Sequence, residues 1–94
     1  MNLFVANWKM NMTRGEAAAY ARELGSLVGD RKLDVELVVA PPFTALDAGK
    51  DPEGRWSMAG QNVASETSGA FTGEVSAKML ADASCRYAIV GHSE

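Results

Sequence analysis

The segment Tyr87-Ala88-Ile89-Val90-Gly91-His92-Ser93-Glu94 indicates how the chain is organised. Residues 87–90 are apolar and rich in β-branched and aromatic side chains, which is typical of a short buried strand. A glycine and a histidine follow directly. The segment therefore predicts a strand that carries His92 at its carboxyl end, where an imidazole can act as an acid, a base or a hydrogen-bond donor near neutral pH.

Three further apolar runs predict strands upstream of this one. They are residues 3–6, residues 35–40 and, with a glycine and a polar end, residues 56–62. Pro41-Pro42 should end the second of these strands, because proline cannot donate a hydrogen bond to a sheet.

The clearest helix is predicted after Thr13. Thr13 and Glu16 have the spacing of a capping box, and Gly29 is suited to end the helix. Between them, apolar residues recur at helical spacing and predict one buried face. These residues are Ala17, Tyr20, Ala21, Leu24, Leu27 and Val28.

Two shorter helices are expected further along. The first begins at 43–46 with Thr44 as its cap, and it cannot run far because turn-forming residues follow at Gly49, Asp51-Pro52 and Gly54. The second covers 76–83, with Ser76 as its cap and three inward-facing residues: Met79, Leu80 and Ala83. Cys85, just before the last strand, is interpreted as a small buried apolar residue rather than a nucleophile.

The order of these elements is strand, helix, strand, short helix, strand, helix, strand. This alternation favours right-handed βαβ units and a parallel sheet in a single α/β domain. In such a sheet the carboxyl ends of all strands lie at the same edge.

The composition narrows the class of protein. The chain has 94 residues, 47% of them hydrophobic, and a formal net charge of -3. Neither nucleic acid nor an anionic membrane is expected as a partner of such a chain. Its one cysteine excludes an internal disulfide, and it contains neither an apolar stretch of about 20 residues nor the pattern of a signal peptide. A soluble, cytoplasmic protein is expected.

Polar side chains follow three of the predicted strands. Asn7 and Lys9 follow the first, Gln61 and Asn62 the third, and His92 and Glu94 the fourth. A cation, amide donors and a neutral imidazole at one edge of a sheet are suited to stabilising negative charge on a carbonyl oxygen and moving its proton. For 7–11 alone, a polar loop that caps a strand is the alternative interpretation.

Other kinds of site are not indicated. One histidine and one cysteine cannot build a structural zinc site, so no metal is expected. The sequence has neither a phosphate-binding P-loop, nor a dinucleotide fingerprint after the first strand, nor a serine nucleophile elbow, and no cofactor is expected.

Residues 63–73 form a long predicted loop that contains one aromatic residue, Phe71, between two glycines. Loops of this length are usually functional or mobile. The ring should dock either on its own domain or on another subunit, as an interface anchor. The sequence favours neither.

Five motifs in this order resemble the triosephosphate isomerase family. They are Ala6-Asn7-Trp8-Lys9-Met10-Asn11, Ala40-Pro41-Pro42, Gln61-Asn62-Val63, Gly69-Ala70-Phe71-Thr72-Gly73-Glu74-Val75-Ser76 and Val90-Gly91-His92-Ser93-Glu94. The resemblance covers the whole chain. It implies that residues 1–94 are the N-terminal half of a (β/α)8 TIM barrel, with strands one to four and helices one to three, truncated before the second half.

The resemblance also implies roles for individual residues. Lys9 would supply positive charge to a triose phosphate and its enediolate, and Asn7 would hydrogen-bond a substrate oxygen. His92, uncharged, would polarise the carbonyl, while Ser93 and Glu94 would support the catalytic base and Lys9. The loop with Phe71, Thr72 and Glu74 would form the interface of a homodimer, in an enzyme of glycolysis and gluconeogenesis.

The 94 residues contain no match to the family's general-base glutamate, its lid or its phosphate-binding loops. The chain by itself is therefore expected to be inactive. The alternative is a half-barrel assembly module without catalysis, which associates with itself or with a complementary C-terminal half. A flavodoxin-like binding domain would explain the alternation of elements but not the motifs.

Overall fold

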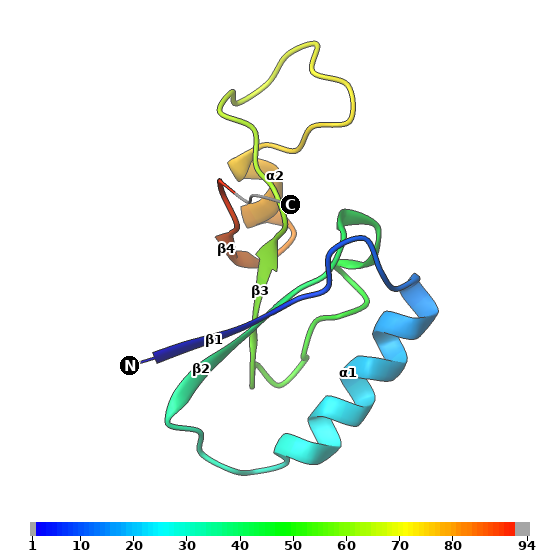
Figure 1. Cartoon of the computed structure of the whole chain (residues 1–94), viewed down its shortest axis with the longest axis vertical. Helices are drawn as coiled ribbons and strands as arrows, with labels where there is room; N and C mark the ends of the chain where they lie inside the picture. The colour runs from blue at the N-terminus through cyan, green and yellow to red at the C-terminus, as the bar shows by residue number, and fades with distance from the viewer. Residues whose placement is uncertain (1, 92–94) are drawn as a thin grey trace.

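A computed structural model of the chain, which describes residues 2–91, confirms the parallel sheet. Its strands lie in the order β1-β2-β3-β4, and each pair of neighbours is parallel (Figure 1). The strands are β1 (Asn2–Asn7), β2 (Val35–Ala40), β3 (Ser57–Gly60) and β4 (Cys85–Ala88). The predictions made for His92, Ser93 and Glu94 lie outside the described residues.

The first helix, α1 (Arg14–Val28), begins and ends as predicted. The Thr13 hydroxyl accepts a hydrogen bond from the Glu16 backbone N–H at 3.2 Å, and the Glu16 carboxylate accepts one from the Thr13 N–H at 2.8 Å. These bonds lower the pKa of Glu16, because they favour the charged carboxylate. Gly29, with a φ of 55°, donates to the Gly25 carbonyl and ends the helix.

The main core lies between α1 and the sheet. Its buried members are Trp8, Ala17, Val39, Ala45, Leu46, Trp56, Met58 and Leu80. The helix contacts the sheet through a narrow stripe that includes Ala17, Ala21, Leu24 and Val28. Leu27 lies at the margin of this stripe and is 64% exposed, so its predicted burial is wrong.

The segment between β2 and β3 contains little helix. A single turn of 3-10 helix, η1 (Phe43–Ala45), follows Pro42, which is its N-cap and makes no side-chain capping bond. Thr44 was expected to be the cap. That expectation is wrong because the turn begins at Phe43 and therefore contains Thr44. The early end of this helix is confirmed.

The helix α2 (Ala77–Asp82) has the predicted cap, since the Ser76 hydroxyl accepts from the Met79 N–H at 3.2 Å. Leu80 is buried as expected, but Met79 is 56% exposed and does not face inward. The last strand begins at Cys85, two residues before the predicted start, because Cys85 already pairs with Met58 of β3. Cys85 is half-buried within this strand.

Candidate functional site

The carboxyl ends of the four strands meet at one edge of the sheet, which we call the carboxyl rim and define as residues 7–11, 40, 60–62 and 88–91. Asn7 pairs with Ala40, and Gly60 pairs with Ala88. The Trp8 N–H donates to the Ala40 carbonyl at 3.1 Å, and the Ile89 N–H donates to the Gly60 carbonyl at 2.8 Å. The predicted gathering of polar residues at this edge is thereby confirmed for Asn7, Lys9 and Gln61.

Lys9 has a strained backbone, with a φ of 56°. For a residue other than glycine, this left-handed conformation costs about 1–2 kcal/mol. Local hydrogen bonds hold the turn: the Lys9 N–H donates to the Asn7 side-chain oxygen at 3.0 Å, and the Asn11 amide donates to the Trp8 carbonyl at 2.8 Å. Strain kept in place by surrounding bonds is common at ligand sites.

The Gln61 side chain links the Lys9 turn to the sheet by hydrogen bonds. Its side-chain Nε2 donates to the Lys9 carbonyl at 2.8 Å and to the Ala40 carbonyl at 2.9 Å, so one amide links the ends of β1, β2 and β3. The sequence suggested Gln61 as an amide donor to a ligand. Its amide hydrogens are instead used within the rim, and Gln61 positions Lys9.

The Asn7 side chain is exposed, and its orientation follows from one bond. Because its Oδ1 accepts from the Lys9 N–H, its NH2 group is the part suited to donate to a ligand oxygen. Asn11, which the sequence placed with Asn7 and Lys9 in a candidate ligand site, supports the same turn through its side-chain amide. In the sequence, an asparagine that braces a turn through the backbone cannot be told from one that binds a ligand, because both follow the end of a strand.

The loop of residues 64–75 projects away from the sheet (Figure 1), and its base is closed by a hydrogen bond from the Ala64 N–H to the Val75 carbonyl at 2.8 Å. Thr72 and Glu74 are exposed. The Phe71 ring lies against Gly69 of its own loop, where an added Cβ would be 2.7 Å from the ring, yet it is 48% exposed. A half-exposed ring in a projecting loop is available for contact with another chain.

The remaining chemistry of the described chain is limited. Within residues 2–91 no cluster of acidic, histidine or cysteine residues could hold a metal ion. Burial raises the pKa of the Cys85 thiol, which disfavours the nucleophilic thiolate.

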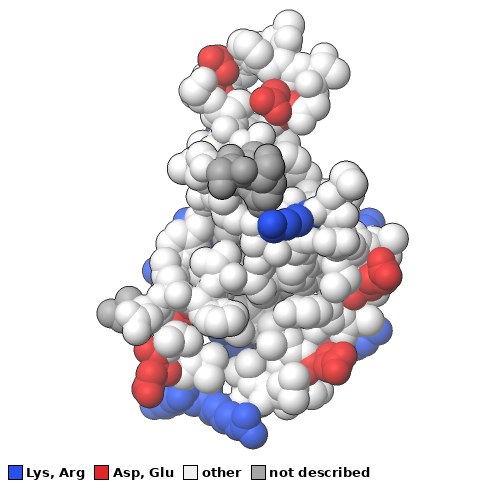
Figure 2. Space-filling view, viewed as in Figure 1, with Lys and Arg blue, Asp and Glu red and all other residues white. Residues whose placement is uncertain are grey.

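Acidic and basic side chains are interspersed on the face of the molecule shown in Figure 2, with no continuous patch of one charge sign. The same described part contains no helix with the length and apolarity of a membrane span.

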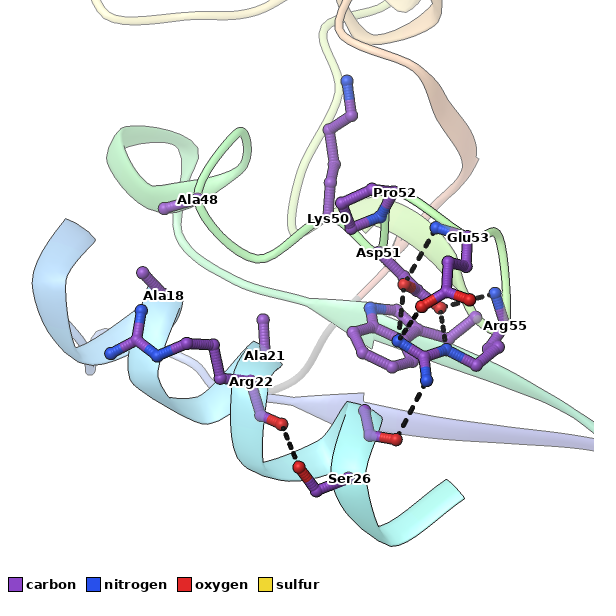
Figure 3. Close-up of a pocket in the computed structure, with 12 residues that line it drawn as sticks. Ala18, Ala21, Arg22, Ser26, Ala48, Lys50, Asp51, Pro52, Glu53 and Arg55 are labelled. Atoms are coloured by element: carbon purple, nitrogen blue, oxygen red, sulfur yellow. Dashed lines mark hydrogen bonds and ion pairs between the residues drawn. The ribbon is translucent and has the colours of Figure 1, made fainter. Parts of the chain in front are cut away.

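One groove in the described part of the chain lies away from the residues of the rim. It has a volume of about 580 Å³ and lies between α1 and residues 48–56 (Figure 3). Arg55 occupies its wall: its guanidinium contacts the Asp51 carboxylate and donates to the Gly25 carbonyl of α1 at 2.9 Å. The groove therefore marks the place where Arg55 and Asp51 join the 47–56 segment to α1, and it contains no residue proposed for catalysis.

Four parallel strands in sequential order, with polar side chains at their carboxyl ends, define an α/β protein with the architecture of the first half of a TIM barrel. The sequence profile of triosephosphate isomerase matches residues 2–94. The chain therefore belongs to the triosephosphate isomerase family, as its motifs indicated.

Curated relatives carry the same name. The chain is 50% identical to a triosephosphate isomerase of Nitratidesulfovibrio vulgaris, with 98% of the chain and 38% of that protein covered. It is 47% identical to one from Chloroflexus aurantiacus, with 98% and 37% covered. It is 50% identical to one from Syntrophotalea carbinolica, with 97% and 37% covered. The chain thus spans less than two-fifths of the length of these relatives.

Proposed function

We propose that the chain supplies the carbonyl-polarising side of a triosephosphate isomerase site. The reaction would interconvert dihydroxyacetone phosphate and glyceraldehyde 3-phosphate by proton transfer through an enediolate. The proposal is carried by the turn of Asn7 and Lys9, which hydrogen bonds hold at the carboxyl rim. The chain that contains this turn belongs to the triosephosphate isomerase family. A cation and an amide donor held in place there are suited to stabilising charge that develops on a carbonyl oxygen.

The roles of the residues follow the family resemblance. Lys9 attracts the phosphate and stabilises the enediolate, and Asn7 donates to the substrate oxygen. His92, uncharged, polarises the carbonyl and moves protons between the two oxygens. Glu94 and Ser93 support Lys9 and the resting catalytic base. Of these residues, Asn7 and Lys9 have a geometry at the rim that favours their part.

The 94 residues by themselves should not turn over substrate. Proton removal from carbon needs a general base, which contributes roughly 10²–10⁴ in rate, and no match to the family's base is present in this sequence. Complementation tests the proposal. The 94-residue chain is mixed with a polypeptide that covers the unmatched part of the Nitratidesulfovibrio relative, and isomerisation is followed in a coupled assay.

We expect activity only from the mixture, and Lys9→Met should lower it by at least about 10²-fold. Lys78→Met is the matched control, because Lys78 is exposed on α2 and is not among the residues of the rim. Near-normal turnover by the pure 94-residue chain, or equal loss of activity in the two lysine variants, would contradict the proposal.

A second function, that of a half-barrel assembly module without catalysis, is favoured by the edge strand β1. Leu3, Phe4 and Val5 are 52%, 62% and 45% exposed. Because successive residues of a strand face opposite sides, β1 presents apolar groups on both faces as well as an unpaired edge. Size-exclusion chromatography with light scattering should detect self-association, and a monomer at tens of micromolar would contradict it.

We also propose a homodimer in which the 64–75 loop, with Phe71, Thr72 and Glu74, contacts the partner. The half-exposed Phe71 ring supports this proposal. Phe71→Ser in the complemented protein should shift it from dimer to smaller species on the same column.

We propose a cytoplasmic location, because a chain with a single cysteine fits a reducing compartment. Cell fractionation that finds the protein elsewhere would contradict this location.

A further inference from the structure

A carboxylate on β2 accepts hydrogen bonds from side chains of β3, its neighbour in the sheet, and of β4, the strand beyond β3. One oxygen of Glu36, Oε2, accepts a hydrogen bond from the Ser57 hydroxyl of β3 at 3.0 Å and from the Tyr87 hydroxyl of β4 at 2.8 Å. An Arg86 guanidinium nitrogen lies 3.6 Å from the same oxygen. The Glu36 side chain is 21% exposed, whereas that of Arg86 is 69% exposed, so the ion pair with Arg86 is open to water.

The pairing of β3 with β4 is irregular at this place. Met58 pairs with Cys85, but the next residue, Ala59, pairs with Tyr87. Arg86 is therefore an extra residue in β4, which is the arrangement of a β-bulge. The bulge explains how Arg86 and Tyr87, neighbours in the chain, can both reach Glu36.

Packing on the two faces of the sheet gives independent evidence for the bulge. Cys85 packs against the core under α1, the same core that contains Met58. Tyr87 and Ile89 pack instead with Val38, Ala40 and Ala59, which form a separate cluster. In a regular strand, residues two apart share a face, so the side change between Cys85 and Tyr87 requires the extra residue.

The apolar pattern of β4 does not select this register. Without a bulge, Ala59 would pair with Arg86, and Tyr87 and Ile89 would share the face of Cys85. Both registers place apolar residues on each face, because the run after Arg86 is apolar throughout: Tyr87, Ala88, Ile89 and Val90. A shift of one residue in pairing turns every later side chain to the other face. A contact outside the apolar pattern must therefore make the choice.

We propose that Glu36 is a positioning residue that fixes the bulge at Arg86 and thereby the facing of the carboxyl end of β4 at the rim. The proposal rests on the function proposed above, in which the segment after β4 carries His92. Glu36 acts through its hydrogen bond with the Tyr87 hydroxyl, which keeps the Tyr87 side chain on the face of the sheet opposite Cys85. Arg86, which lies between Cys85 and Tyr87, is then the residue without a partner in β3.

The charge state of the pair agrees with this geometry. The Tyr87 hydroxyl donates to Glu36, which holds the pKa of the Glu36 carboxyl below its ordinary value. The same bond raises the pKa of the Tyr87 hydroxyl. The carboxylate is therefore charged and accepting at neutral pH, as a fixed anchor for the hydroxyl must be.

The test measures the register directly, by cross-strand proton contacts in NMR spectra of the isotope-labelled 94-residue chain. The unchanged chain and Glu36→Gln, which keeps a side-chain oxygen acceptor, should both show contacts between Ala59 and Tyr87. Glu36→Leu should lose them and show Ala59 beside Arg86. Ser57→Ala is the matched control, since it removes a bond to the same oxygen without touching β4, and it should keep the original register.

Deletion of Arg86 provides the rescue. Without this residue, Met58 beside Cys85 and Ala59 beside Tyr87 become a regular ladder, so the anchor is no longer needed. The double variant, with Arg86 deleted and Glu36→Leu, should restore the contact between Ala59 and Tyr87. If Glu36→Leu does not fold, this double variant decides: a folded, regular β4 supports the proposal, and failure to fold overturns it.

Retention of the Ala59–Tyr87 contact in Glu36→Leu would also overturn the proposal. Activity in the complementation assay is read separately. Glu36→Leu should lose most of the activity of the mixture, and the double variant should recover it. If the register changes as expected but no mixture is ever active, the proposed isomerase function fails while the assignment of Glu36 as the register anchor stands.

Discussion

Replacing Asp51 by alanine should destabilise the chain severely. The Asp51 side chain has no exposed surface, and its two oxygens accept four hydrogen bonds, from the Glu53 N–H and from the N–H, Nε and Nη2 of Arg55. Loss of one partner of a buried ion pair costs roughly 3–5 kcal/mol. The Arg55 side chain is 25% exposed, and partial contact with water reduces the expected loss to about 2–3 kcal/mol.

A domain of this size has a free energy of unfolding of about 5–14 kcal/mol, so the variant should lose a substantial part of it. The midpoint of thermal unfolding should fall by roughly 8–20 °C. Urea unfolding followed by tryptophan fluorescence measures the change. Asp47→Ala is the control, because Asp47 is 77% exposed and lies 3.8 Å from Lys50, and its loss should be within about 0.5 kcal/mol. Equal stability of Asp51→Ala and the control would refute the reasoning.

The same carboxylate makes stability depend on pH. Hydrogen bonds from Arg55 hold the pKa of Asp51 below its ordinary value of 3.8 in the folded chain. Because the pKa is lowered by folding, the charged Asp51 carboxylate stabilises the folded chain fully at pH values above its ordinary pKa. This stabilisation is lost as the pH falls through the lower pKa that Asp51 has in the folded chain. Urea unfolding from neutral pH to below 3.8 should therefore show a steeper acid decline for the unchanged chain than for Asp51→Asn. Parallel declines would show that Asp51 does not titrate in this way.

Two further predictions concern local hydrogen bonds. Trp56→Phe should cost about 1 kcal/mol more than Trp8→Phe in urea unfolding, because the Trp56 indole N–H donates to the Gly49 carbonyl at 3.0 Å, whereas the buried Trp8 N–H has no hydrogen-bond partner among the described residues. Equal costs would contradict this. Thr13→Ala should remove about 1 kcal/mol by opening the capping box with Glu16, and circular dichroism should show a shorter α1 at the same urea concentration. An unchanged midpoint would show that the cap adds nothing.

Patterns that depend on near neighbours were predictable from the sequence. The capping box of α1, the strand at 35–40 that Pro41 ends, and the parallel order of strands all follow from spacing that a local reading captures. The rim could be predicted only in outline. Parallel strands bring Asn7, Lys9 and Gln61 to one edge, but which of them binds a ligand and which braces the turn depends on distances between strands.

Features that arise from packing across the sheet were missed. The exposure of Leu27 depends on how wide a stripe of α1 the sheet covers. Helical spacing predicts which residues share a face but does not predict the width of the buried part of that face. The start of β4 depends on the neighbouring strand β3, because Met58 of β3 pairs with Cys85. The bulge at Arg86 follows from Glu36, a residue far away in the sequence, so no local pattern could reveal it.

The hydrogen bond that closes the base of the 64–75 loop separates two kinds of surface in this chain. Between its endpoints, residues 65–74 are exposed, so insertions and substitutions there can accumulate with little effect on strand pairing. The turn at Lys9 is tied to three strands at once, and a change in any one of them would be felt in its conformation. Strand pairing therefore places little constraint on the loop, whose sequence is constrained by what it contacts, while the sheet itself constrains the rim.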